Sequence, residues 1–246
     1  EAGFNDARAL SSGEAGTALH EADFAVSPDG GAVATTWQRA AGKGYFEVDL
    51  VLFEGGGHRV LGTGADFHSP AFSPDGRRLL ALRNDRGDPE HAPDVTLWVF
   101  DLAGGEGRDL TPDLDLWPAE PVWAADSSAI YFVADERGHR PLYRVELESG
   151  RLARLTSDGS FAAPAPDPGG AAVFAIHSSY AQPPEVVRIE GGAVRSLPTP
   201  GLPLELPGEV SEVSVTGPDG VERRGWLVTP KEASAQAPVP LVLWIH

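Results

Sequence analysis

A short turn motif recurs along this chain, and its spacing limits the possible folds more than any other feature. Ser27-Pro28-Asp29-Gly30 and Ser73-Pro74-Asp75-Gly76 are two intact copies, and each is followed by a run of apolar residues. A third copy carries Ala125-Asp126-Ser127. A fourth carries Asp167-Pro168-Gly169, where Pro168 is interpreted as an insertion. The anchoring aspartates, Asp29, Asp75, Asp126 and Asp167, recur about every 40–50 residues, the range of propeller blades.

The chemistry of the motif predicts a tight turn between a short strand and a longer apolar strand. Proline presets its backbone angle, aspartate can bond its own backbone, and glycine adopts the left-handed conformation. A third strand is predicted in each repeat, at 48–54, 95–102, 142–147 and 185–189. Short fourth strands are predicted to end near Leu61, Thr111, Thr156 and Leu197. The run Leu97–Phe100 is apolar on both faces, as expected for a strand between neighbouring blades.

The expected fold class is therefore all-β: a partial β-propeller of about four four-stranded blades. We predict blades around 21–62, 66–111, 118–156 and 160–200, within a propeller domain at 1–206. Residues 1–20 are the expected tail of a preceding blade. An open row of blades leaves two apolar faces uncovered, so further blades are expected upstream. The alternative is a closed propeller of four blades.

Composition narrows the possible partners. The chain has 36 acidic and 19 basic residues, a net charge of −17, which disfavours nucleic acid because phosphates need a basic surface. The absence of cysteine excludes disulfides and thiolate catalysis in this chain. No apolar run reaches the about 18 residues of a membrane span. The expected location is the cytoplasm, and homo-oligomerisation stays open.

A different pattern begins after Pro207. Glu209–Thr216 alternates valines with polar residues, Gly217-Pro218-Asp219-Gly220 predicts a turn, and 221–228 predicts the return strand. The stretch 230–240 is rich in alanine and proline and is expected to be a surface loop. The final run, Leu241–His246, is predicted to be a buried strand, and the chain is expected to be part of a larger protein.

From this point the chain resembles the prolyl oligopeptidase family of serine peptidases, particularly its acylaminoacyl-peptidase and dipeptidyl-peptidase branches. The matching features are the hairpin from Asp219-Gly220 to Gly225-Trp226, the proline-rich loop and the strand that ends at His246. The segment Tyr180–Val187 is also similar to the one that this family carries before its hydrolase domain. The resemblance implies that 207–246 holds the first strands of an α/β-hydrolase domain.

The same resemblance implies a serine exopeptidase that hydrolyses short peptides, with a propeller that restricts access to the active site. By family order all three residues of the Ser-His-Asp triad would follow His246, so no catalytic residue is assigned in this chain and the chain alone is expected to be inactive. His246 would open the loop beside the oxyanion site. The alternative function is that of a TolB-like propeller, a non-enzymatic scaffold for protein interactions.

Three arginines in the loops between second and third strands are candidate substrate-binding residues. Arg83, Arg86 and Arg137 could bind a peptide carboxylate or acyl oxygen, because guanidinium groups bind carboxylates in a bidentate manner. The alternative for each is a surface salt bridge. No cofactor is expected, and the histidines lack the spacing of metal ligands.

Overall fold

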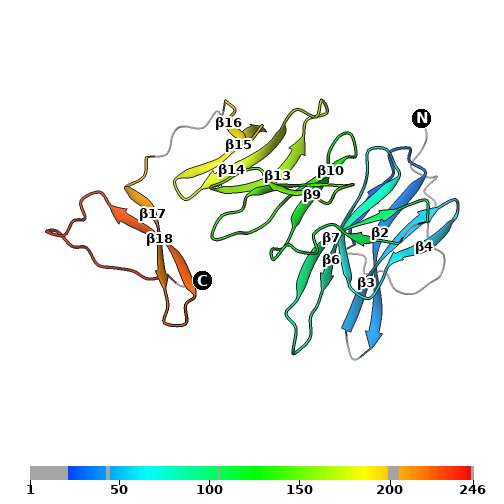
Figure 1. Ribbon diagram of the computed structural model, residues 1–246, viewed down its shortest axis with the longest axis horizontal. Coiled ribbons are helices and arrows are strands. Elements are labelled where there is room, and N and C mark those ends of the chain that lie inside the picture. Colours follow the sequence, from blue (N-terminus) through cyan, green and yellow to red (C-terminus); the bar gives the residue numbers. More distant parts are fainter. Residues whose placement is uncertain (1–21, 43–44, 105, 199–204, 245–246) are drawn as a thin grey trace, which may run out of the picture.

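The computed structural model describes residues 22–42, 45–104, 106–198 and 205–244 (Figure 1). These residues form strands and turns and no helix, which confirms the all-β prediction. Four antiparallel sheets of four strands precede a separate two-stranded hairpin. Because each sheet pairs its strands in chain order, each is a meander of the kind that makes a propeller blade.

The blades follow one another along the chain and across Figure 1. Blade one comprises β1 (Phe24–Val26), β2 (Ala32–Gly42), β3 (Tyr45–Glu54) and β4 (Gly57–Gly62). Blade two comprises β5 (Asp66–Phe72), β6 (Arg78–Asp85), β7 (Asp94–Asp101) and β8 (Arg108–Asp109). Blade three comprises β9 (Ala119–Trp123), β10 (Ala129–Val133), β11 (Leu142–Glu146) and β12 (Leu152–Arg154). Blade four comprises β13 (Ser160–Pro166), β14 (Val173–Ser179), β15 (Gln182–Glu190) and β16 (Ala193–Ser196).

The hydrophobic core lies between the blades rather than within them. Leu97 and Val99 of β7 point into a cluster shared with blade three, whereas Phe100 of the same strand joins a cluster shared with blade one. A third cluster, around Phe161, joins blades three and four. The strand β7 is thus covered on both faces, as its apolar sequence predicted, because alternate side chains of a strand point to opposite sides.

The recurring turn has the predicted chemistry in the first two blades. In blade two the Ser73 hydroxyl donates to Asp75 Oδ1 at 2.6 Å and accepts the Arg78 N–H at 2.9 Å. Gly76 has a φ of 71°, the left-handed region that a glycine adopts without a steric penalty. The hydrogen bond from Ser73 is the main cause that lowers the pKa of Asp75 below its usual range.

The fourth copy of the turn differs from the sequence-based alignment. Asp167 N donates to Ala172 O, and Gly170 N donates to Asp167 O, as Ser73 and Gly76 do in blade two. Asp167 therefore occupies the serine position and Gly169 the aspartate position, so Pro168 is not an insertion. The prediction of Asp167 as the equivalent of Asp75 is wrong because two positions of this turn, separated by the proline, can each hold an aspartate that bonds the backbone.

The first strands of blades two to four share a bulge that the turn motif did not predict. Ser69, Glu120 and Ala163 each precede a proline and have φ values of 52°, 51° and 49°. The strand register shifts in β5, β9 and β13 at these points. Bulges bend a strand and redirect its side chains, so the residue at this position lies outside the regular ladder of backbone hydrogen bonds.

The last hairpin joins β17 (Gly208–Thr216) to β18 (Glu222–Pro230) through the turn at Gly217–Gly220. The prediction of a buried strand over 241–246 is wrong for Leu241–Trp244, whose residues have no strand pairing and are 81, 84, 76 and 86% exposed. The described chain provides no neighbouring strand to complete its hydrogen bonds and no layer to cover its side chains. His246 and residues 1–20 lie outside the described residues.

Candidate functional site

A tight turn of blade three meets the last hairpin and creates the most developed site of the described chain. Glu136 and His139 exchange both backbone hydrogen bonds, at 2.8 and 2.9 Å, and leave Arg137 and Gly138 as the turn residues. Their φ values are 50° and 81°. Two positive φ values define a type I′ turn, which suits the twist of a hairpin. Arg137 therefore stands at the tip of a rigid projection.

His139 connects three elements of the fold. Its Nδ1 accepts the Gly159 N–H at 3.0 Å, which links blade three to blade four. Its Nε2 lies 3.9 Å from Glu212 Oε2 on β17. Its ring meets the Trp226 indole of β18 edge-on, with ring centroids 5.4 Å apart at 89°. A side chain that is only 14% exposed thus contacts two blades and the hairpin.

Trp226 is the residue by which the hairpin packs on the propeller. Tyr180, at the turn between β14 and β15, lies with its ring centroid 4.9 Å from that of Trp226. On the other side, a Cβ placed on Gly138 would lie 3.5 Å from Trp226 Nε1, so the turn backbone packs against the indole. Glu212 and Trp226 are register partners in β17 and β18, so both side chains face the propeller.

A cavity of about 790 Å³ opens beside this contact. Its walls combine the blade-three turn, the loop around Gly159, Tyr180 of blade four, and Glu212 and Trp226 of the hairpin. A second cavity of about 460 Å³ is also lined by Arg137 and Gly138, together with Arg224 and Glu222 of the hairpin. The Arg137–Gly138 turn therefore borders both cavities.

The carboxylates of the cavity differ in how far they are neutralised. Glu136 accepts the Tyr143 hydroxyl at 2.9 Å and pairs with Arg154 at 3.2 Å. Burial, followed by the bond to Glu136, raises the pKa of Tyr143 to about 12, so this hydroxyl stays a donor. Glu212 pairs with Arg224. By contrast, the side chain of Asp135 is 91% exposed and lies 3.9 Å from Arg140 Nε, which leaves it open to a ligand.

Arg140 forms part of the wall of the cavity of about 790 Å³. Its Nη2 pairs with Glu120 Oε1 at 3.0 Å, and its backbone N–H donates to Gly159 O at 3.0 Å. The Nε atom is buried and makes no hydrogen bond to any described residue. A buried donor without a partner costs free energy, so this nitrogen favours an acceptor that enters the cavity.

The three predicted arginines lie in different environments. Arg83 belongs to β6, where its guanidinium covers the Trp98 ring at 5.3 Å and approaches Asp85 at 3.5 Å. Arg137 lines both cavities, and no hydrogen bond or ion pair engages its side chain within the described residues. The hydrogen bond and charge of Arg224 lower the pKa of Glu222, and Arg137 adds a smaller effect of the same sign. Arg137 is thus the least engaged of the three.

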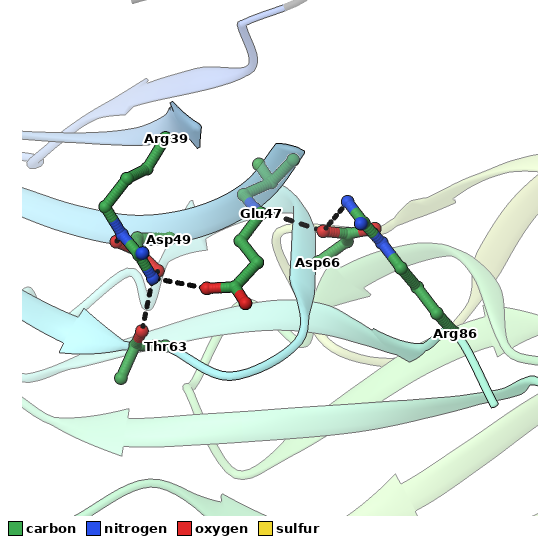
Figure 2. Close-up of polar contacts among 7 residues, drawn as sticks. Arg39, Glu47, Asp49, Thr63, Asp66 and Arg86 are labelled. Atoms are coloured by element: carbon green, nitrogen blue, oxygen red, sulfur yellow. Dashed lines mark hydrogen bonds and ion pairs between the residues drawn. The ribbon is translucent and has the colours of Figure 1, made fainter. Parts of the chain in front are cut away.

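Arg86 forms a bidentate pair with Asp66, in which its Nη2 lies 2.7 Å from Oδ1 (Figure 2). Asp66 also accepts the Val48 N–H at 3.0 Å, so the pair joins blade two to blade one. Nearby, Arg39 binds the buried Asp49 and contacts Glu47 and Thr63 (Figure 2). Because its fork is already occupied, Arg86 has the geometry of a blade-to-blade clamp.

Sequence reasoning missed His139, Glu212 and Trp226 as a group. The spacing of His139 in the sequence does not match that of metal ligands, so no function is predicted for it from the sequence. Arg137-Gly138 flanked by Glu136 and His139 does carry a weak signal of a two-residue hairpin turn. The partners of His139 come from about 20 and 70 residues further along the chain, and no local pattern links them.

Comparisons with known proteins identify similar propellers in two kinds of protein. No protein-family model matches the chain. Over 142 residues it is 30% identical to dipeptidyl-peptidase 5 of Porphyromonas gingivalis, which covers 54% of this chain and 20% of that protein. Over 80 residues it is 31% identical to the Tol-Pal system protein TolB of Rhizorhabdus wittichii, covering 32% of this chain and 17% of that protein.

Solved structures include both of these kinds. The acylaminoacyl peptidase of Pyrococcus horikoshii matches with a TM-score of 0.67 and 16% identity, covering 86% of this chain and 33% of that one. This match and the one to dipeptidyl-peptidase 5 agree with the resemblance to peptidases of this kind, and the solved structure shows a shared propeller fold. TolB of Acinetobacter baumannii matches with a TM-score of 0.52 and 21% identity, covering 84% of this chain and 54% of that one. The matches span 9 to 20% of the length of the curated relatives and 33% of the acylaminoacyl peptidase.

Proposed function

We propose that this chain contributes the substrate-gating propeller of a serine exopeptidase that hydrolyses short peptides, with an activity like that of acylaminoacyl peptidases. In this proposal the hairpin β17–β18 begins an α/β-hydrolase domain, and the catalytic triad belongs to residues beyond His246. The observation that carries the proposal is the packing of Trp226 on the blade-three turn beside a cavity of about 790 Å³. Such a cavity, at a junction between structural units, is a common place for a ligand site.

Arg137 is the proposed contact to substrate. It stands at a rigid turn tip, lines the cavity and keeps its guanidinium free of ion pairs among the described residues. A peptide carboxylate or acyl oxygen would satisfy this group and the buried Arg140 Nε. Arg83 and Arg86 remain candidate contacts to substrate. In the folded chain, however, the Arg83 guanidinium lies over Trp98, and the Arg86 guanidinium is paired with Asp66.

The test uses the protein encoded by the complete gene that contains this sequence. A fluorophosphonate probe should label that protein, and N-acylated or dipeptide anilides should be hydrolysed. The 246-residue chain alone should show neither reaction. Arg137→Ala should lower kcat/KM about tenfold or more, as expected for the loss of a charged hydrogen bond. Arg151→Ala, which removes an exposed arginine at a turn of blade three, is the matched control.

A second candidate function is a TolB-like scaffold for protein interactions, favoured by the similarity to two TolB propellers. If the complete protein lacks fluorophosphonate labelling and peptidase activity under conditions where it is folded, the scaffold function replaces the peptidase. Label on the isolated chain would place the nucleophile among these residues and would contradict the proposed arrangement.

A further inference from the structure

The two ring nitrogens of His139 face different elements and need different protonation. Nδ1 accepts the Gly159 N–H at 3.0 Å, so it carries no proton in this arrangement. The neutral ring must then hold its proton on Nε2. That N–H lies on the side of Glu212, whose Oε2 is 3.9 Å from Nε2. The hydrogen bond from the Gly159 N–H therefore determines that the neutral ring of His139 presents an Nε2–H to the hairpin.

Protonation of the ring would change both contacts at once. A proton on Nδ1 would place two donors face to face, since the Gly159 N–H cannot find an acceptor there. The same proton would give the ring a positive charge beside the Glu212 carboxylate, which attracts it. Histidine is the side chain that normally changes charge between about pH 5 and pH 8.

The loop that carries Gly159 is packed against blade four and bonded to blade three. Gly159 has a φ of 90°, and a Cβ at this position would lie 2.3 Å from His177 Nε2. The Arg140 N–H donates to Gly159 O at 3.0 Å. Protonation of Nδ1 would therefore remove the acceptor of the Gly159 N–H, whereas the bond from the Arg140 N–H to Gly159 O can persist.

The other charged groups around His139 come from three elements. Its own turn contributes Asp135, Glu136, Arg137 and Arg140, two of each sign. Blade four contributes Asp158 beside Gly159, and His177 behind it. The hairpin contributes Glu212, with Arg224 and Glu222 next to it. Among these groups His177 is the other imidazole, so it is the competing source of any pH response near neutrality.

We propose that His139 is a protonation switch at the junction of the propeller and the hairpin. In the neutral state it joins blade three to blade four through Gly159; in the protonated state it releases Gly159 and binds Glu212 of β17. The switch changes the wall of the cavity of about 790 Å³, because Gly159, Glu212 and Trp226 all line it. Its effect on peptide entry rests on the proposed function, whereas the switch itself does not.

The experiment follows Trp226 and Gly159 in the 246-residue chain from pH 8 to pH 5. The protein is labelled with 5-fluorotryptophan, and Trp226→Phe assigns the Trp226 ¹⁹F resonance. This resonance should shift with the titration of one proton. After correction for intrinsic exchange, the protection factor of the Gly159 amide should fall about fivefold to tenfold, the change expected for one lost hydrogen bond. The ¹⁵N shifts of His139 should show the Nε2–H tautomer at pH 8.

Three variants separate the possible causes. His139→Gln should abolish both responses, because its side-chain oxygen can accept the Gly159 N–H and does not titrate. His177→Gln should retain them, and so should His91→Gln, in the loop of blade two. A pH-independent Trp226 resonance, an Nδ1–H tautomer in the wild-type chain at pH 8, or a response that survives His139→Gln would overturn the proposal. None of these readouts requires peptidase activity, so the switch and the proposed function fail independently.

Discussion

The Glu120 carboxylate of blade three accepts a hydrogen bond from the Ala163 backbone N–H of blade four. The two residues occupy the same position of the repeat, four residues before the turn, and both have left-handed φ values. Asp23 and Ser69 form the same contact between blades one and two, at 2.8 Å. In both pairs, the backbone N–H at the bulge of one blade donates to a carboxylate of the preceding blade.

Removal of this carboxylate should weaken the packing of blade four. Glu120→Ala should lower the free energy of unfolding by about 1–3 kcal/mol, because it removes a charged acceptor from the Ala163 N–H and the ion-pair partner of Arg140 Nη2. Urea denaturation of the 246-residue chain measures the change. Glu90→Ala, at an exposed loop of blade two, is the control and should change stability by less than about 0.5 kcal/mol.

The buried hydroxyl of Thr111, at the end of blade two, should also stabilise the fold. Thr111 is 4% exposed, and its hydroxyl accepts the Leu97 N–H of β7 at 3.0 Å. Thr111→Val keeps the shape but leaves that buried N–H unpaired, which should cost about 1–3 kcal/mol in the free energy of unfolding. Thr216→Val, on an exposed position of β17, serves as the matched substitution. Equal urea midpoints for the two variants would show that the hydroxyl contributes nothing.

Trp226 should hold the hairpin on the propeller. Each of its aromatic contacts, with His139 and Tyr180, is expected to contribute about 0.5–1.5 kcal/mol. Trp226→Ala should therefore raise amide hydrogen exchange in β17 and β18 about tenfold and leave blades one and two unchanged. Trp244→Ala removes a tryptophan that is 86% exposed and should leave exchange in the hairpin as it is.

The turn aspartates should make the propeller sensitive to acid. Hydrogen bonds from Ser27, Ser73 and Ser128 are the main causes that lower the pKa values of Asp29, Asp75 and Asp126. A pKa that is lower in the folded than in the unfolded chain adds stability that is complete above the unfolded value, near 4. That stability is lost as pH falls below about 4 through the lowered folded values.

Thermal unfolding between pH 7 and pH 2.5 measures this loss. Ser73→Ala removes the hydrogen bond that is the main cause of the lowered pKa of Asp75. The fall in Tm on acidification should therefore be smaller in that variant. Asp113→Asn, at an exposed loop position, should leave the slope of Tm against pH unchanged. A wild-type chain whose Tm stays constant below pH 4 would contradict the assignment.

Arg86 allows a direct choice between a structural and a substrate-binding role. If the pair with Asp66 is a clamp between blades, Arg86→Ala should lower the free energy of unfolding by about 1–3 kcal/mol, since Asp66 is 8% exposed and loses its counter-charge. If Arg86 binds substrate, stability should hold while the KM of the complete enzyme rises. Arg83→Ala, on the strand β6 that directly precedes Arg86, provides the comparison.

Local signals in the sequence were sufficient for the blades. The Ser-Pro-Asp-Gly turns, the apolar runs after them and the two-faced strand at Leu97–Phe100 each depend on residues that are close in the chain. Such patterns reflect backbone angles and strand periodicity, so they can be recognised without knowledge of the fold. The same reasoning misplaced Asp167, because it aligned a residue type where the structure aligns a hydrogen-bond pattern.

The sequence by itself determined that this chain makes four-stranded blades with apolar faces between them, and that a hairpin of another kind follows. Only the tertiary structure decided that His139 meets Gly159, Glu212 and Trp226, that the Asp66 carboxylate occupies Arg86, and that Arg137 is left free to face a cavity. The physical reason is distance along the chain. Turns and strands depend on residues that are neighbours in the sequence, whereas a site between blades is formed by side chains that meet only when the sheets pack.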